Sequence, residues 1–479
     1  FVEDTAVDPA KLPEFIKRFR EILSRHDAVA GYYGHCSVGC MHIRPLINLK
    51  SESEVKKMTA IADEISDLVI EFQGALSGEH GDGLARSHFN EKLYGPVLYE
   101  AFRHIKRTFD PKNLMNPGKI VDAPPMTESL RIGPSYKTWQ PETLLDFSSQ
   151  GGFGAAVEMC NGMGECRKKL DGTMCPSYMA TLDEEHSTRG RANALRAVLS
   201  GKVPKEDFSG KRLYEVMDLC LECKACKAEC PSNVDMAKLK YEFLSHYYQA
   251  NGLPLRNRIF GRIERLNRWG SRLAPVSNWI ANSRPNRWLL ERLAGIDSRR
   301  PLPSFAGESF EDWFRGHRFE GKEEKGTVIL FHDTFNTFNS PAVAIAATRF
   351  LERTGYRVTL VDKRCCGRPL ISKGMLQQAK EYAAWNIERL SPYAEQNVPI
   401  IGLEPSCLLT LRDEYPELVR TESARLVARK SFLLEEFLLG ERQGGRLSLG
   451  FKINGAKALL HGHCHQKALV GTAPTVAVL

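Results

Sequence analysis

Apolar side chains recur every three or four residues in two stretches near the start of the chain. These stretches are PAKLPEFIKRFREIL at residues 9–23 and SESEVKKMTAIADEISDLVIEFQG at residues 51–74. Such spacing places the apolar side chains on one face of an amphipathic helix. Because short strand-like runs separate the helices, residues 1–123 are predicted to form an α+β domain.

The pattern changes twice further along the chain. Residues 124–154 are rich in Pro, Gly and Ser, as is typical of a linker, and residues 155–320 have a helical pattern. In residues 321–479, strand-like runs alternate with helical stretches, which predicts a parallel α/β sheet with right-handed crossovers. The runs are TVILFHD (327–333), YRVTLVD (356–362), VPIIGLEPSC (398–407) and AKALLHGHC (456–464).

Length and composition limit the class of protein. A chain of 479 residues with moderate charge indicates a globular protein of several domains, and the patterns above predict mixed α/β and α+β structure for them. Its apolar runs fall short of the roughly 20 residues that a bilayer span needs. The N-terminus has no pattern of a secretory signal. Since the chain begins with Phe1 rather than Met, we expect a fragment of a longer protein.

The cysteines indicate the redox compartment. The chain has 13 of them, and most lie in short clusters. Clustering of this kind favours metal or cluster ligation over disulfides, so we expect a reducing, cytoplasmic location.

One segment accounts for the net charge of +8. Between Arg256 and Arg300 there are eleven Arg residues against Glu264, Glu291 and Asp297, and three Trp residues are interleaved with them. The simpler interpretation is a solvated helical face whose Trp side chains pack inward. The alternative is peripheral docking on an anionic membrane, at its cytoplasmic face, or on a partner. Nucleic acid is not expected as a partner, because no recognition module is present.

The strongest chemical signal is LCLECKACKAECPS, which contains Cys220, Cys223, Cys226 and Cys230 followed by Pro231. The C-x2-C-x2-C-x3-C-P spacing is the signature of bacterial ferredoxins. Its first three thiolates hold one 4Fe-4S cluster, and the fourth ligates a second cluster.

The partner motif, CNGMGECRKKLDGTMCPSY, is irregular. Cys160, Cys166 and Cys175 fit three of its positions, but Met163 stands where the second cysteine is expected. By the crossover rule, Cys175 completes the first ligand set and Cys230 joins Cys160 and Cys166 in the second. A set of three thiolates would support either a three-iron cluster or a 4Fe-4S cluster with one non-thiolate ligand.

The last segment contains KRCCGRP with Cys365 and Cys366, then Cys407 in EPSC and Cys464 in HGHCHQKA. The CC-G pair resembles the CCG cysteine-rich domains of heterodisulfide reductase and of the glycolate oxidase and anaerobic glycerol-3-phosphate dehydrogenase iron–sulfur subunits. These domains occur as paired repeats, and the second repeat is truncated here. The stretch FHDTFNTFN lacks the initial cysteine of the first repeat, so the sequence leaves open whether this segment binds a third cluster.

Three motifs of the first segment occur in a fixed order: GHCSVGCMH, then GALSGEHGDG, then FDPKNLMNPGKI. Together they resemble the C-terminal half of FAD-linked oxidases of the vanillyl-alcohol-oxidase type, which include D-lactate and D-2-hydroxyglutarate dehydrogenases. The resemblance implies FAD as cofactor. It also implies that the glycine-rich flavin-binding half lies outside these residues.

The same resemblance assigns roles to residues of this sequence. His35, His42 and Glu79 correspond to the ligands of a divalent metal, for which zinc is expected, while Cys36 and Cys40 take no part. His80 corresponds to the active-site histidine that takes the hydroxyl proton, and Asn116 lies in the flavin-contacting N-P-G-K motif. Arg44 would pair with the carboxylate of the substrate.

The order of segments resembles fused flavin and iron–sulfur dehydrogenases that act on D-2-hydroxy acids. The expected reaction oxidises D-2-hydroxyglutarate, or else D-lactate, to the 2-oxo acid and passes electrons through 4Fe-4S clusters to a quinone or another acceptor. A homo-oligomer is expected. The alternative is an iron–sulfur electron-transfer subunit that has no substrate site of its own.

Overall fold

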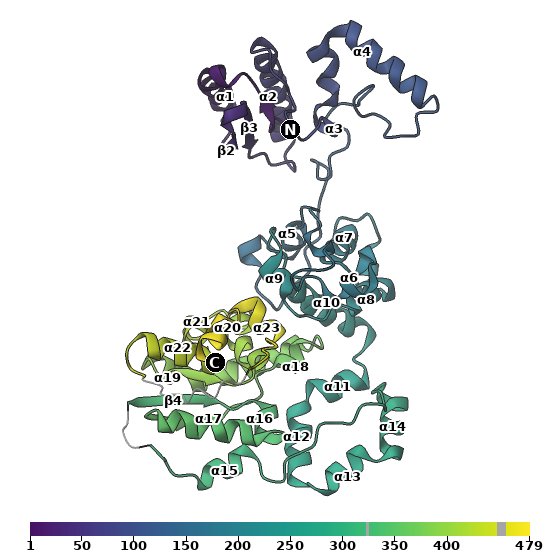
Figure 1. Cartoon of the computed structure of the whole chain (residues 1–479). Coiled ribbons are helices and arrows are strands. Elements are labelled where there is room, and N and C mark those ends of the chain that lie inside the picture. Colours follow the sequence, from purple (N-terminus) through teal and green to yellow (C-terminus); the bar gives the residue numbers. More distant parts are fainter. Residues whose placement is uncertain (322–324, 448–456) are drawn as a thin grey trace. The chain divides into compact units, whose positions relative to one another are not determined.

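A computed structural model describes residues 1–321, 325–447 and 457–479 (Figure 1). Contacts divide the chain into two compact units, Phe1–Lys137 and Thr138–Leu479. The helical and α/β segments after residue 138 therefore pack into one unit. No helix among the described residues is both long enough and apolar enough to cross a bilayer.

The first unit combines helices with a small antiparallel sheet. The sheet has the order β1-β3-β2, and β2 and β3 form a hairpin in which His35 pairs with Cys40 and Tyr33 with His42. The strands are β1 (Thr5–Ala6), β2 (Ala30–His35) and β3 (Cys40–Pro45). The helices are α1 (Leu12–Arg25), α2 (Glu52–Glu71), α3 (Gly83–Arg86) and α4 (Asn90–Phe109).

The hydrophobic core of this unit lies between the sheet and α1 and α2. Phe15 and Phe19 of α1 pack with Ile61 and Ile65 of α2 and with Ile43 of β3, and all five side chains are buried. Successive side chains of a strand point to opposite faces. Since Met41 and Ile43 face the core, Cys40 and His42 face the other side of β3.

The hairpin turn requires glycine at its last position. Gly39 has φ of +73°, and a Cβ atom there would lie 1.8 Å from the carbonyl oxygen of Val7. Only a residue without a side chain fits this conformation and this close approach. The turn thereby places His35 at the end of one strand and His42 near the start of the next.

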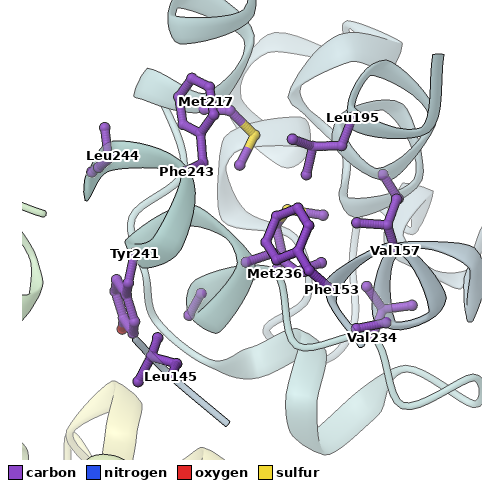
Figure 2. Packing of buried hydrophobic residues seen from close by; sticks show 14 of the residues in the cluster. Leu145, Phe153, Val157, Leu195, Met217, Val234, Met236, Tyr241, Phe243 and Leu244 are labelled. Atoms are coloured by element: carbon purple, nitrogen blue, oxygen red, sulfur yellow. The ribbon is translucent and has the colours of Figure 1, made fainter. Parts of the chain in front are cut away.

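The second unit begins with a segment that has only helices. Phe153, Leu195, Met217 and Phe243 point toward one another in its core (Figure 2). The helices are α5 (Phe153–Glu158), α6 (Pro176–Thr181), α7 (Thr188–Leu199), α8 (Lys211–Asp218), α9 (Ala225–Glu229), α10 (Met236–Asn251), α11 (Leu255–Gly261), α12 (Ile263–Arg272), α13 (Val276–Asn282), α14 (Arg284–Ala294) and α15 (Phe310–Gly316).

A four-stranded parallel sheet of order β5-β4-β6-β7 forms the core of the last segment. Figure 1 shows α17 on one side of β4 and α19 on the other. The strands are β4 (Gly326–Phe331), β5 (Tyr356–Thr359), β6 (Ile400–Gly402) and β7 (Ser431–Leu433). The helices are α16 (Thr334–Phe338), α17 (Pro341–Arg353), α18 (Arg368–Ile371), α19 (Leu376–Glu395), α20 (Pro405–Leu418), α21 (Glu422–Lys430), α22 (Leu434–Gln443), α23 (Cys464–Leu469) and α24 (Ala473–Val478).

The parallel sheet confirms the expected α/β pattern, but one strand was assigned wrongly. The run AKALLHGHC begins at residue 456, outside the described residues, and residues 457–463 form no strand. The fourth strand is instead Ser431–Leu433, whose three residues are too few to show a period in the sequence. Part of the expected linker 124–154 belongs to the second unit, because Leu145 and Phe147 are buried in the core of that unit.

The Arg-rich segment forms α11 to α14. Its three tryptophans do not pack inward as the simpler interpretation expects: Trp269 is 61% exposed, Trp279 is 75% exposed and Trp288 is 58% exposed. Core packing therefore does not explain why these large apolar side chains lie on the surface beside many cations.

Candidate functional site

A buried carboxylate positions the loop that carries Glu79 and His80. Asp4 is fully buried, and its carboxylate accepts hydrogen bonds from Ser77 Oγ (2.7 Å), the Glu79 N–H (3.1 Å) and the His80 N–H (2.8 Å). Burial opposes ionisation of Asp4, but the hydrogen bonds from His80, Ser77 and Glu79 outweigh it and hold the pKa below its usual value. Sequence reasoning missed Asp4, since nothing in VEDTAV signals a metal or a turn.

Three imidazoles converge on one oxygen of Glu79. The Oε1 atom of Glu79 lies 2.9 Å from Nε2 of His42, 3.4 Å from Nε2 of His80 and 3.5 Å from Nε2 of His35. The rings of His42 and His80 stack with centroids 4.8 Å apart. The structure therefore brings together all three residues that the sequence suggested as metal ligands, with His80 beside them.

The donor atoms present fit a divalent metal. Imidazole nitrogen and carboxylate oxygen are the ligands that zinc and related ions take in catalytic sites. Nδ1 of His42, the ring nitrogen that is not at Glu79, is buried without a hydrogen-bond partner among the described residues, which is a costly state for a polar atom. One ligand atom each from Asp4, Cys40, His42 and Glu79 also lies within 4.8 Å of the others.

Cys40, which the sequence suggests takes no part, lies within this group of atoms. Its Sγ atom donates to Asp4 Oδ1 at 3.6 Å. Burial, together with this carboxylate, raises the pKa of the Cys40 thiol to about 11. The thiol is therefore a neutral hydrogen-bond donor at neutral pH. Cys36 is exposed and lies outside the group.

Glu3 links Arg44 to His80. Arg44 donates through Nε to Glu3 and lies over the ring of Tyr33, while Oε1 of Glu3 lies 3.4 Å from Nδ1 of His80. Although burial alone would raise it, the hydrogen bond from Arg44 leaves the pKa of Glu3 lowered. Glu3 was also missed, and it holds the guanidinium that the sequence suggested for the substrate.

A cavity beside the convergence point contains the other predicted residue. His80 and Asn116 line the same cavity, together with Phe102 and Ile105 of α4 and Met115. Asn116 has φ of +47°, a conformation that Asn tolerates better than most residues. The side chain of His80 thus lies between the group around Glu79 and this cavity.

The cysteines of the helical segment of the second unit line two separate cavities. One is lined by Cys175, Cys220, Cys223 and Cys226, and the other by Cys160, Cys166 and Cys230 with Met163. These are the two sets that the crossover rule predicts. Burial raises the pKa of the thiols of Cys220, Cys223 and Cys226. Bound iron would supply the positive charge that such buried sulfur needs to be a thiolate.

Buried ion pairs anchor the first cysteine loop to the α/β segment. Lys224, between Cys223 and Cys226, is buried and pairs with Glu414 and, at 2.5 Å, with Asp413 of α20. Glu222, on the same loop, lies 3.3 Å from the guanidinium of Arg368. A buried pair is costly to break, so these contacts fix the loop.

The four cysteines of the last segment do not form one group. Cys365, Cys366 and Cys407 are buried, and Cys366 contacts both of the others. Cys464 is exposed at the start of α23, which packs against α9 of the first cysteine loop. The structure therefore offers three grouped thiols where the CC-G resemblance led us to consider a third cluster.

Comparison with known proteins agrees with this arrangement. Residues 1–120 match the family of FAD linked oxidases, C-terminal domain, and residues 156–234 match the 4Fe-4S dicluster domain. The chain is 29% identical over 459 residues to a D-2-hydroxyglutarate dehydrogenase of Haemophilus influenzae, covering 87% of this chain and 44% of that protein.

Two further relatives match one part each. A D-lactate dehydrogenase of Archaeoglobus fulgidus is 36% identical over 120 residues, 25% of this chain and 26% of the relative. One of the subunits of the anaerobic glycerol-3-phosphate dehydrogenase of Escherichia coli is 28% identical over 234 residues, 48% of this chain and 59% of the relative. The chain spans about half the length of the curated D-2-hydroxyglutarate dehydrogenases that it matches.

The matches identify an FAD linked oxidase C-terminal domain in residues 1–120 and a 4Fe-4S dicluster domain in residues 156–234. The chain is homologous to D-2-hydroxyglutarate dehydrogenases and, over a quarter of its length, to D-lactate dehydrogenase. The matched domains support FAD and iron–sulfur clusters as cofactors.

Proposed function

We propose that the chain is the C-terminal part of a dehydrogenase that oxidises a D-2-hydroxy acid, D-2-hydroxyglutarate in the first place and D-lactate next, to the 2-oxo acid. The observation that carries this proposal is the convergence of His35, His42 and His80 on Glu79, because a pure electron relay needs no such group. The curated relatives supply the substrate class.

In this proposal His35, His42 and Glu79 hold a divalent metal, with zinc the expected ion. Such an ion, when bound, lowers the pKa of a coordinated hydroxyl group. His80 takes the hydroxyl proton through the ring nitrogen near Glu79, and Glu3 orients the ring at its other nitrogen, Nδ1.

Arg44 exchanges its contact with Glu3 for one with the substrate carboxylate in this proposal. Asn116, which lines the same cavity as His80, would contact the flavin of the complete protein. FAD, when bound, accepts the hydride from Cα. The half of the protein that would bind the pyrophosphate of FAD corresponds to the part of the relatives that this chain does not span.

The cysteines form the electron path in this proposal. Cys175, Cys220, Cys223 and Cys226 hold a 4Fe-4S cluster, and Cys160, Cys166 and Cys230 hold a second cluster of three-iron or mixed-ligand type. Clusters carry one electron at a time, so they can drain a two-electron flavin in steps. A quinone or another carrier is the final acceptor.

The location that we propose is cytoplasmic, with peripheral contact to the inner face of the membrane through α11 to α14. The exposed Trp269, Trp279 and Trp288 next to eleven Arg residues support it, since such a surface suits anionic lipid. We also propose that the protein forms a homo-oligomer.

The deciding experiment compares two substitutions in the full-length, cofactor-loaded protein. We expect His80→Ala to slow flavin reduction by D-2-hydroxyglutarate about 100-fold or more, because positioned acid–base catalysis contributes ~10²–10⁴. Cys223→Ser should leave flavin reduction near normal while turnover with the acceptor collapses. His104→Ala, an exposed histidine of the same unit, is the control. Stopped-flow flavin bleaching separates the two steps.

An electron-transfer protein without its own substrate site is the second candidate. The match to the anaerobic glycerol-3-phosphate dehydrogenase of Escherichia coli over 48% of the chain favours it. Absence of flavin reduction in the wild type, with every D-2-hydroxy acid tried, would refute the dehydrogenase and favour this alternative. Flavin reduction at the wild-type rate in His80→Ala would instead refute the assignment of His80 as the base.

A further inference from the structure

An apolar cavity of about 540 Å³ lies in the second unit beside the Arg-rich helices. This volume is in the range of sites that take small organic ligands. Most of the wall is apolar and comes from α11, α12, α14 and the chain after them. It includes Ile259, Phe260, Ile263, Leu266, Leu290 and Phe305.

One part of the wall is polar. It consists of Arg368 and Ser372 with Lys373, from α18 and the residues that follow it, and Arg256 adds a further cation. Arg368 is buried and held in place, with its guanidinium 2.5 Å from Glu414 Oε1. The cavity therefore offers an apolar chamber with cationic hydrogen-bond donors along one side.

The cavity opens beside the exposed Trp269 of α12. Leu266 and Phe335 line it and are 48% and 40% exposed, so the opening lies there. Trp269 follows Leu266 by three residues on α12, so the two side chains lie on the same face of that helix. A lipophilic ligand could enter from a membrane against which these helices lie.

The polar wall adjoins the loop that carries Cys220 and Cys223, and the wall helix α12 contacts the pair Cys365 and Cys366. Arg368 follows Cys366 by two residues, and its Nη2 atom lies 3.3 Å from Glu222, between Cys220 and Cys223. On α12, Glu264 accepts a hydrogen bond of 3.1 Å from the backbone N–H of Cys365. Through Arg368, a ligand in the cavity would therefore lie next to the loop that carries Cys220 and Cys223, which the proposed function assigns to electron transfer.

We propose that this cavity binds a lipophilic quinone that serves as the electron acceptor. The proposal rests on the proposed function, which supplies the electrons. Oxidation of the hydroxy acid to the 2-oxo acid releases two electrons and two protons. The quinone takes up two electrons and two protons at its carbonyl oxygens to give the quinol. The apolar wall accommodates the isoprenoid body and ring, and the cationic side chains donate hydrogen bonds to the carbonyl oxygens.

Lys373 is suited to supply a proton. Burial lowers the pKa of its ammonium group; the charges of Glu222 and Asp218 oppose this shift, while those of Lys240 and Arg256 add to it. A lowered pKa makes the ammonium a stronger acid, so it gives up a proton to the reduced quinone more readily.

The test uses the full-length holoenzyme with two acceptors, decylubiquinone and ferricyanide. Leu290→Trp fills the cavity, whereas Leu293→Trp, on the same helix but 64% exposed and outside the wall, is the matched control. We expect Leu290→Trp to raise KM for decylubiquinone at least about tenfold. Both variants should keep the wild-type rate with ferricyanide, which also shows that they fold. Palmitate, a single-chain amphiphile without redox chemistry, should compete with decylubiquinone in the wild type.

The outcomes separate this proposal from the proposed function. An unchanged KM for decylubiquinone in Leu290→Trp, no quinone reduction by a wild type that is active with ferricyanide, or palmitate binding without competition each overturns the quinone site alone. Loss of all hydroxy-acid oxidation overturns the proposed function instead. In that case dithionite-reduced protein mixed with decylubiquinone still tests the cavity, through the rate of cluster reoxidation in Leu290→Trp against Leu293→Trp.

Discussion

The backbone N–H of His80 donates a 2.8 Å hydrogen bond to Asp4, a residue 76 positions earlier in the chain. The same buried carboxylate holds the Glu79 N–H and the Ser77 hydroxyl. One side chain near the N-terminus therefore sets the position of the carboxylate on which the three histidines converge.

We expect Asp4→Asn to weaken zinc binding about 10- to 100-fold, as loss of an outer hydrogen-bond partner does in metal sites. The free energy of unfolding should fall by about 1–3 kcal/mol, because buried backbone N–H groups lose a charged acceptor. Zinc competition with a chromophoric chelator and denaturant unfolding measure the two effects. Asp8→Asn, at an exposed cap with a hydrogen bond to the Ala10 N–H, is the control and should keep its zinc affinity. Unchanged zinc affinity in Asp4→Asn would contradict the positioning role.

The predicted ligands should differ in importance. His42 is buried and 2.9 Å from Glu79, so His42→Ala should abolish stoichiometric zinc, whereas His35→Ala, exposed and at 3.5 Å, should only weaken it. His26→Ala, which removes a ring that contacts Glu64 instead, is the control. Metal analysis after dialysis measures occupancy. Full zinc content in His42→Ala would rule out this ligand set.

Met163 lines the cavity that holds three cysteines, so Met163→Cys should complete a four-thiolate set. If the wild type holds a three-iron cluster, its iron content should rise from about seven to about eight per chain, and the paramagnetic signal of the oxidised three-iron cluster should disappear. Met115→Cys, an exposed position in the first unit, is the control. Iron analysis with electron paramagnetic resonance tests this. An unchanged signal would show that position 163 does not face the cluster.

Glu229 ties down the loop before Cys175, and it predicts an acid dependence. Burial opposes ionisation, but Lys168 at 2.8 Å and hydrogen bonds from Thr173 and Met174 lower the pKa of Glu229 from 4.5 to about 2. A lowered pKa stabilises the fold above pH 4.5, and this stabilisation is lost as the pH falls toward 2.

Glu229→Gln should therefore be less stable than the wild type at neutral pH by on the order of 2 kcal/mol, and the difference should shrink on acidification. Thermal unfolding at a series of pH values measures it. The exposed Glu215→Gln serves as control and should show a small difference that does not depend on acid in this way. A Glu229→Gln difference that stays constant down to pH 2 would argue against the pKa shift.

The exposed tryptophans predict binding to anionic vesicles. Trp279→Ala and Arg287→Gln should each weaken sedimentation with vesicles that contain phosphatidylglycerol, the arginine by about fivefold, since a cation near such a surface contributes ~1 kcal/mol. Added salt should weaken the binding of the wild type as well. Leu170→Ala, 98% exposed outside the Arg-rich segment, should have no effect. Equal sedimentation of all variants would show that α11 to α14 do not face the membrane.

The sequence by itself determined the features that a few neighbouring residues encode. The period of apolar residues predicted α1 and α2, and the alternation of strands and helices predicted the parallel sheet. The C-x2-C-x2-C spacing indicated the cluster ligands, because one loop of a few residues presents those sulfur atoms. The three-residue strand Ser431–Leu433 was beyond this approach, since a run so short has no period.

Only the tertiary structure decided which distant residues meet. The contacts of Asp4 and Glu3 with His80, and of Lys224 with Asp413, join residues 76 to 189 positions apart, and no local pattern encodes such pairs. The exposure of Trp279 was likewise undetermined, because the same helical period serves a face that packs inward and a face that meets lipid. Packing of the whole chain, through burial and hydrogen bonds between segments, makes that choice.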